Sequence, residues 1–385
     1  MSALFDFAVV GAGISGSATA YELAKRGHSV VLIDQYGPAS MASGWTLAGV
    51  RQSGRHKAEM PLARAAVERW QTLGNELEGE THYRQVGNLR CARNDEEADR
   101  IAAIVAEHRA LGLEMHLVTG KEVQEIAPMV SPDVVCASFC PTDGHADPHA
   151  TVKSFVDAAT RLGAETRFGE LVTALEITEG KVSGVVTVKG VIAAGQVVVA
   201  TGIYGNKLIG RFGYHVPYEV MSATMMRSVA TPAPQMPVIG VANGDTTLRQ
   251  EVLGQFRIGG GHEVWDGHLE LDPWPQVRPP ASSVAELIKR YSALVPELAG
   301  VKLDRLWCGL IDQTVDALPV LDILPEAGGI VLATGFSGHG FCLGPVTGAI
   351  LADLAEGATP DLPIEPFRMS RFAGVAVSST VELHG

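Results

Sequence analysis

The stretch FAVVGAGISGSATAYELAKRGHSVVLID, residues 7–34, decides the fold of this chain. A short apolar run opens it and predicts a buried strand, after which Gly11, Gly13 and Gly16 turn the chain into a helix. The first glycine permits a tight turn, the second lets backbone amides approach a pyrophosphate, and the third lets the helix lie close to the sheet. The helix dipole and the unpaired amides of the first turn then favour an anion.

A second predicted strand, 29–33, ends at Asp34, where a carboxylate can bind both hydroxyls of an adenosine ribose. A strand, a glycine turn, a helix and an acid in this order are the context that a dinucleotide-binding motif requires. This context argues against the alternative, a glycine-rich turn that binds nothing. We therefore predict an α/β fold with a Rossmann-like domain and a central parallel sheet.

Composition limits the class of protein. With 385 residues, 46% of them hydrophobic and 19% charged, the chain is long enough for about two domains. The formal net charge of -13 argues against nucleic acid or an anionic membrane as a partner. Five cysteines without CxxC spacing indicate neither a disulfide framework nor a zinc site and favour the cytoplasm. The sequence shows no signal peptide and no apolar run of about 18 residues, so we expect no membrane span.

The middle of the chain alternates strands and helices. Residues 35–56 are rich in Gly, Ser and Ala, which lets the backbone lie against a flat ligand. The segment VVVATG, ending at Thr201 and Gly202, predicts a central parallel strand whose carboxyl end faces a ligand crevice. Alternating patterns at 216–226 and 247–258 predict antiparallel strands of a separate layer for substrate. Further strands are predicted at 171–178, 182–188, 303–310 and 330–334, and helices at 61–77, 95–111, 121–127 and 284–295.

A second glycine-rich segment, FSGHGFCLGPVTGAI, follows the strand at 330–334. Pro345 suits the first turn of a helix, so we predict a glycine loop at 338–344 that leads to a helix N-terminus. A partial positive charge there would favour electron density on a bound ring, as on a reduced flavin. The alternative is a plain strand-to-helix turn. Together with the opening motif, the segment indicates that both turns face one crevice.

These segments resemble the D-amino acid oxidase family of FAD-dependent oxidoreductases, which includes glycine oxidase and sarcosine oxidase. The resemblance spans nearly the whole chain, and its most specific parts are WCGLIDQTVDALPVLD at 307–322 and ATGFSGHGF at 333–341. The stretch AGVRQSGRHKAEMPLARAAVERW at 48–70 resembles more narrowly the β-type catalytic subunits of heteromeric opine, hydroxyproline and sarcosine dehydrogenases.

The resemblance implies two domains and an FAD. We expect a discontinuous FAD-binding domain at 1–82, 141–213 and 304–385, and an α+β substrate domain with a mainly antiparallel sheet at 83–140 and 214–303. A further FMN or iron–sulfur centre would lie at or in partner subunits. The FAD contacts that we assign are Gly11, Ala12, Gly13, Ile14, Ser15, Gly16, Asp34, Gln35, Ser43, Gly44, Leu47, Gly49, Val50, Val172, Thr201, Gly202, Gly335, Gly338, His339, Gly340 and Phe341.

Three positions depart from the family pattern. Ile311 stands where glycine and D-amino acid oxidases place an arginine that binds the substrate carboxylate. Cys342 stands where monomeric sarcosine oxidases place a lysine, and Gly309 where they place the cysteine that attaches flavin. We therefore expect non-covalent FAD, although Cys308 lies one residue before Gly309, and a carboxylate site built from other residues.

Arg51 is the first candidate for that site, because it follows the small-residue loop at 43–50 that the resemblance places beside the flavin ring. A guanidinium also matches a carboxylate with two hydrogen bonds. A structural salt bridge or a phosphate contact is the open alternative for it. We also expect His339 to position substrate or flavin. Weaker candidates are Arg55 and His56, and Arg249 and Arg257 if they face the crevice. His145 and His149 are four residues apart in a loop without a third ligand, so we predict hydrogen bonding and no metal.

We predict an FAD-dependent dehydrogenase that oxidises the C–N bond of a secondary-amine amino acid by hydride transfer to flavin. Opine-like N-carboxyalkyl amino acids are the favoured substrates, and the chain would be the catalytic β-type subunit of a heteromeric complex. No residue is identified as a dedicated base, because a desolvating pocket can lower the pKa of the amine. The alternatives are a stand-alone oxidase for sarcosine, glycine or D-amino acids, an FAD-binding scaffolding subunit and an NAD-dependent dehydrogenase.

Overall fold

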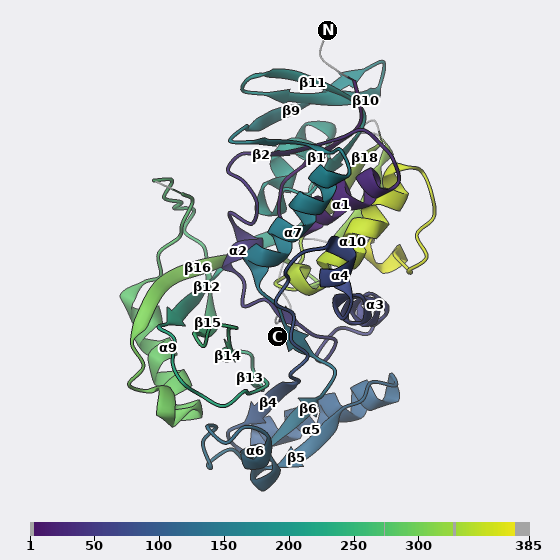
Figure 1. The fold of residues 1–385 in the computed structure, drawn as a ribbon. Coiled ribbons are helices and arrows are strands. Elements are labelled where there is room, and N and C mark those ends of the chain that lie inside the picture. The colour runs from purple at the N-terminus through teal and green to yellow at the C-terminus, as the bar shows by residue number, and fades with distance from the viewer. Residues whose placement is uncertain (1–3, 273, 326–328, 374–385) are drawn as a thin grey trace.

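The computed structural model describes residues 4–272, 274–325 and 329–373. Within them, the strands form two sheets of eight strands each and one sheet of two strands. Figure 1 shows the two large sheets in separate parts of the molecule, joined by several crossings of the chain. The mixed α/β fold with a Rossmann-like parallel sheet and a second, mainly antiparallel sheet is confirmed.

The first sheet has the predicted parallel centre. Its order is β17-β18-β11-β1-β2-β8, and all neighbours in this order run parallel except β17 and β18. The antiparallel strands β9 and β10 extend it from β11. The bounds are β1 (Phe5–Val10), β2 (Val30–Asp34), β8 (Glu165–Phe168), β9 (Val172–Thr178), β10 (Lys181–Thr187), β11 (Gly190–Val199), β17 (Val320–Leu324) and β18 (Ile330–Thr334).

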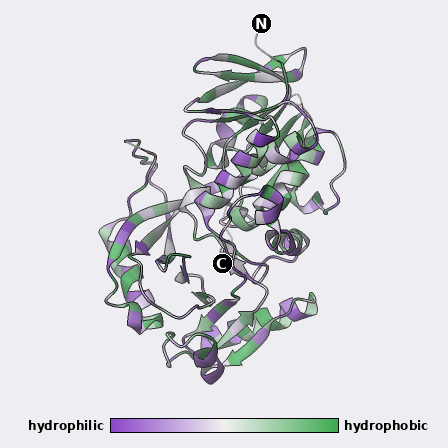
Figure 2. Cartoon of the chain, viewed as in Figure 1, coloured by the Kyte–Doolittle hydropathy of each residue, from purple (hydrophilic) through white to green (hydrophobic). Residues whose placement is uncertain are grey.

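Helices cover this sheet and pack closely on one another. Helices α1 (Ile14–Lys25) and α10 (Gly340–Ala355) meet where a Cβ on Gly348 would lie only 2.5 Å from the Cβ of Ala18. Helices α3 (Met60–Trp70), α4 (Leu73–Leu77) and α7 (Pro148–Arg161) lie beside them, and their residues share one buried core. These helices carry both hydrophobic and hydrophilic residues (Figure 2), as expected for helices with one buried face.

The second sheet has the order β16-β12-β15-β14-β13-β4-β6-β5 and is antiparallel except between β13 and β4. Helices α6 (Gly120–Ile126) and α9 (Ala281–Leu294) contribute to its core, and α5 (Asp95–Ala110) packs on β4 and β6. The bounds are β4 (Asn88–Ala92), β5 (His116–Thr119), β6 (Cys136–Cys140), β12 (Tyr218–Ser228), β13 (Val238–Val241), β14 (Thr247–Gln250), β15 (Phe256–Val264) and β16 (Leu303–Thr314).

Three predicted elements differ in the structure. The predicted helix 61–77 is two helices, α3 and α4, because a turn separates Trp70 from Leu73. The predicted strand 247–258 is the pair β14 and β15 with a tight turn between them. Helix α10 begins at Gly340, so Pro345 lies inside it rather than in its first turn. Packing of its buried face against α1 offsets the loss of the one backbone hydrogen bond that the proline cannot donate.

The proposed division into domains stays a prediction. Its boundary at 304 falls at the start of β16, which pairs along its whole length with β12 in the second sheet.

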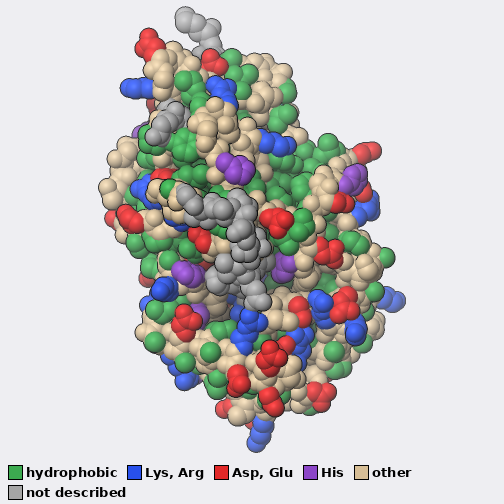
Figure 3. Space-filling model, turned by 180° about the vertical axis from the view of Figure 1, so that it is seen from behind, with side chains coloured by type: hydrophobic (Ala, Val, Ile, Leu, Met, Phe, Trp, Pro, Cys, Tyr) green, Lys and Arg blue, Asp and Glu red, His purple; other side chains and the backbone are tan. Residues whose placement is uncertain are grey.

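Acidic and basic side chains are interspersed over the face drawn in Figure 3. Among the helices of the described residues, none combines the length and the apolar character needed to cross a membrane.

Candidate active site

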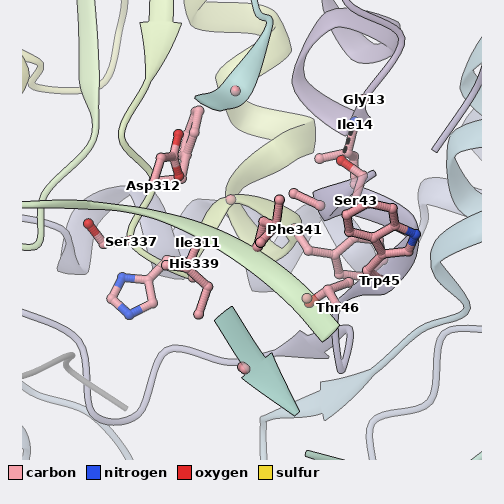
Figure 4. A pocket seen from close by; sticks show the side chains of 18 of the residues that line it. Gly13, Ile14, Ser43, Trp45, Thr46, Ile311, Asp312, Ser337, His339 and Phe341 are labelled. Carbon is pink, nitrogen blue, oxygen red and sulfur yellow. Dashed lines mark hydrogen bonds between the residues drawn. The ribbon is translucent and has the colours of Figure 1, made fainter. Parts of the chain in front are cut away.

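A large cavity is lined by residues from both sheets and has a volume of about 1520 Å³. Figure 4 shows part of it, with side chains from the first helix, the loop after β2, β16 and the start of α10. A typical small-molecule pocket measures about 300–1,000 Å³, so this cavity can hold a dinucleotide and a second small ligand.

The glycine turn after β1 forms the first wall of the cavity. Gly11 has φ 106°, and a Cβ there would lie 2.3 Å from the backbone oxygen of Ala200. A Cβ on Gly16 would lie 1.9 Å from the oxygen of Gly11, so the turn and the helix touch as the motif requires. The Ile14 amide donates to the Ser43 hydroxyl at 3.0 Å, the dashed line in Figure 4. This is a backbone cradle at a helix N-terminus, which fits a pyrophosphate.

Asp34 lies at the end of β2 and lines the cavity. One carboxylate oxygen accepts from the Ala12 amide at 2.8 Å, and the other accepts from the Tyr36 and Gly37 amides at 2.7 and 2.8 Å. These amides fix the carboxylate in place, and each oxygen has lone-pair capacity for further donors. The geometry therefore fits the predicted contact to ribose hydroxyls.

The loop after β2 is held by the second sheet. Arg257 donates through Nη1 to the Thr46 backbone oxygen at 2.5 Å, and Arg249 donates through Nε to that of Leu47. The Trp307 indole donates to the Trp45 oxygen at 2.8 Å. Neither arginine is among the described residues that line the cavity. Arg249 and Arg257 were candidate carboxylate ligands only if they faced the crevice, and they do not. Both instead stabilise the backbone of the loop after β2.

Arg51, Arg55 and His56 do line the cavity. The Arg51 guanidinium donates through Nη1 to the Ser53 backbone oxygen at 2.7 Å. Burial and the charges of Arg55 and Arg90 lower the pKa of Arg51 well below its usual value. An incoming carboxylate would relieve this repulsion, which agrees with the role predicted for Arg51.

His339 precedes the first residue of α10 and is almost fully buried. Its Nδ1 lies 3.2 Å from Oε2 of Glu59, a carboxylate with no exposed surface. Burial and the charge of Arg55 lower the pKa of His339 to about 4, so the ring is neutral near pH 7. Burial raises the pKa of Glu59, but His339, Arg55 and Arg51 reverse this and keep it ionised. A carboxylate at this distance favours the tautomer with the proton on Nδ1.

Asp312 follows Ile311 on β16, and both line the cavity. Its carboxylate accepts from the Gly335 amide at 2.7 Å and from the Thr334 hydroxyl at 3.4 Å. Burial raises the pKa of Asp312 to about 6. The carboxylate therefore fixes the turn between β18 and α10, at the position where the glycine-rich segment starts.

The structure brings most of the predicted FAD contacts to one cavity. Those that line it are Gly11, Gly13, Ile14, Ser15, Asp34, Gln35, Ser43, Leu47, Gly49, Val172, Thr201, Gly202, Gly338, His339, Gly340 and Phe341. Five others pack behind the lining: Ala12, Gly16, Gly44, Val50 and Gly335. As contacts of FAD, all of these residues stay predictions.

His145 and His149 take part in packing and hydrogen bonding. The Nδ1 of His145 lies 3.3 Å from Nη1 of Arg249, and a Cβ on Gly44 would lie 2.6 Å from the His149 ring. Among the described residues, no group of three or more His, Cys, Asp and Glu side chains could hold a metal ion.

Several lining residues were not identified from the sequence. Arg90 on β4, and Arg100 and His108 on α5, line the same cavity as Arg51. They lie far from every glycine motif in the sequence, and no local pattern marks them. The amphipathic helix predicted at 95–111 was the nearest signal, since its cavity face carries two of them.

Comparison with known proteins gives the family. Residues 6–354 match the model of the FAD dependent oxidoreductase family. Glycine oxidase of Geobacillus kaustophilus is 27% identical over 97% of this chain and 99% of that protein. Sarcosine oxidase subunit beta of Rhodobacter capsulatus is 25% identical over 98% of this chain and 92% of that protein. The crystal structure of L-proline dehydrogenase from P. horikoshii superposes with a TM-score of 0.88 at 28% identity, covering 97% of this chain and 99% of that one. The chain therefore belongs to this family, and its cofactor is FAD.

Proposed function

We propose that this chain, a member of the FAD-dependent oxidoreductase family, oxidises the C–N bond of a secondary-amine amino acid, with opine-like N-carboxyalkyl amino acids as the favoured class. One observation carries the proposal. The cavity that contains the dinucleotide cradle is also lined by Ile311, His339 and Arg51. A cofactor and an amino acid carboxylate can therefore share one cavity.

The residues for FAD are those of the two glycine-rich turns. Gly11, Gly13 and Asp34 would hold its ADP part, and the loop at 43–50 with the start of α10 would hold its ring. When bound, FAD supplies the acceptor for a hydride from the carbon beside the amine nitrogen. The amides of the first turn of α10 add a partial positive charge at that end of the site.

The side chains of this chain would place the substrate and set its protonation. Arg51 would bind the carboxylate with two hydrogen bonds. A hydride donor needs a neutral amine, and the nearby positive charges of Arg51, Arg55 and Arg90 disfavour an ammonium ion. The neutral His339 adds no further charge, since burial and Arg55 hold its pKa at about 4. The site thus supports oxidation without a dedicated base.

The experiment is anaerobic reduction of the bound flavin by a panel of amines. Octopine-type and nopaline-type opines, hydroxyproline, proline, sarcosine and glycine are each added to the purified holoprotein, and the flavin absorbance is followed. We expect secondary amines to bleach the flavin, and the colour to return slowly when air is admitted. Bleaching by none of them would refute the proposed activity.

The alternative is a stand-alone oxidase, which the similarity to glycine oxidase of Geobacillus kaustophilus favours. The similarity to sarcosine oxidase subunit beta favours a catalytic subunit within a heteromeric complex, where a further FMN or iron–sulfur centre would belong to partner subunits. Rapid return of flavin colour in air, with one hydrogen peroxide formed per amine oxidised, would decide for the oxidase.

A further inference from the structure

Four arginines line one part of the cavity, next to β4 and α5: Arg51, Arg55, Arg90 and Arg100. A Cβ on Gly54 would lie 3.0 Å from Nη1 of Arg51 and 3.1 Å from both terminal nitrogens of Arg90. These two guanidinium groups therefore flank the same glycine. Burial and the charge of Arg55, with a further contribution from Arg100, lower the pKa of Arg90 to about 10, although the charge of Asp143 opposes them.

Two buried carboxylates near these arginines, Asp143 and Glu59, are already engaged, whereas Glu107 on α5 lines the cavity at an exposed position. Asp143 accepts from the Gln52 amide at 2.9 Å and from the Ser53 hydroxyl at 2.5 Å. Glu59 faces His339 at 3.2 Å. Within the described part of the chain, Nη1 of Arg55 has no hydrogen-bond partner, although the residue is only 4% exposed. A buried cation in this state is costly unless an anion compensates it.

Helix α5 contributes one face to this part of the cavity. Its lining residues are Arg100, Ala103, Ile104, Glu107 and His108, whose spacing places them on one side of a helix. The Nδ1 of His108 lies 2.8 Å from the Ile104 backbone oxygen, and its Nε2 is without a hydrogen-bond partner among the described residues. Ala103 and Ile104 thus place a small apolar surface, and His108 a buried polar atom, beside the arginines, as a carbon chain that ends in an anion requires. Glu107 on the same face is exposed.

We propose that Arg55, Arg90 and Arg100 bind a second carboxylate of the substrate, while Arg51 binds the first. The enzyme therefore prefers dicarboxylic secondary amines over monocarboxylic ones. This inference rests on the proposed function for its reaction, but the anion site itself does not depend on turnover. A guanidinium also matches a phosphate group, so the test includes both anions.

The test compares two amines that differ in one carboxylate, N-(1-carboxyethyl)alanine and N-ethylalanine. Half-saturation of anaerobic flavin reduction is measured for wild-type holoprotein and for Arg90→Gln, Arg100→Gln and Arg109→Gln. The last variant is the matched control, because Arg109 lies on α5 but is not among the described residues that line the cavity.

We expect the dicarboxylic amine to saturate at a concentration at least about tenfold lower, which is typical of an added charge-assisted hydrogen bond. Arg90→Gln should raise this value about tenfold, and the exposed Arg100→Gln about threefold, and both should raise the value for N-ethylalanine by a clearly smaller factor. Arg109→Gln should change neither value. Equal half-saturation for the two amines, or an equal effect of Arg90→Gln on both, would overturn the second site.

A titration with glutarate, followed by perturbation of the flavin spectrum, examines the anion site without reaction. Saturable binding that weakens about tenfold in Arg90→Gln would support it. Binding of orthophosphate as tight as that of glutarate, or no effect of the substitution, would overturn the carboxylate assignment. If no amine reduces the flavin, the proposed function fails, and the glutarate titration still decides the anion site.

Discussion

Replacing His339 with glutamine should remove a large part of the acid sensitivity of the fold. Its side chain is 3% exposed, and burial together with Arg55 lowers its pKa to about 4. An unfolded histidine takes a proton near pH 6.5. Between these values the unfolded chain binds more protons than the folded one, so stability falls as the pH falls. The difference of about 2.5 pKa units corresponds to about 3 kcal/mol over the whole interval.

Urea unfolding of the flavin-loaded protein near pH 7 and near pH 5 gives the measurement. By pH 5 this one histidine should cost the wild type about 2 kcal/mol of unfolding free energy that His339→Gln does not lose. Burial also lowers the pKa of His145, His149 and His262, but these residues are present in both proteins and cancel in the comparison. His215→Gln, at an exposed position, is the control and should behave as the wild type does. An equal loss in wild type and His339→Gln would refute the assignment of a neutral buried ring.

Two other substitutions test the cofactor end of the site. Gly16→Ala places a Cβ 1.9 Å from a backbone oxygen of the turn. The purified variant should therefore lose most of its flavin absorbance relative to its protein absorbance. Gly210→Ala is the control and should keep its flavin, because a Cβ at this position meets nothing within 4 Å. Asp312→Asn should gain stability relative to wild type as the pH rises from 4 to 7. Burial raises the pKa of the folded Asp312 carboxyl from 3.8 to about 6, so its ionisation lowers the unfolding free energy of the wild type by about 3 kcal/mol. A pH-independent difference between Asp312→Asn and wild type would contradict this prediction.

The parts of the fold that follow from local backbone demands could be predicted from the sequence. Gly11 needs a positive φ and Gly16 needs contact with a backbone oxygen, so strand, turn and helix are visible in the sequence alone. The start of α10 was misplaced because Pro345 prefers a first turn, whereas packing against α1 determines where this helix begins. Local residue preferences therefore predicted the turn but not the residue at which the helix begins.

Arg55 was a weaker candidate in the sequence, but its grouping with Arg90 and Arg100 could not be predicted, because no one segment contains all three residues. Arg55 comes from the loop after the flavin loop, Arg90 from a strand of the second sheet and Arg100 from a helix on that sheet. Their convergence depends on how the two sheets meet, and no spacing in the chain encodes it. Arg249 shows the converse. Its position on a strand of the second sheet made it a candidate for substrate binding, but its guanidinium donates to the backbone oxygen of Leu47 instead.

The charge of the whole chain and the charge of its cavity act at different distances. A net charge of -13 repels a dicarboxylate from the surface, yet screening in physiological salt limits this repulsion to about 8 Å. Inside the cavity the low dielectric strengthens the attraction of Arg55 and Arg90, while Asp34 lies at the dinucleotide cradle. An anionic substrate of the proposed kind would therefore be drawn to the arginines and kept from Asp34, so that different parts of one cavity could select two different ligands.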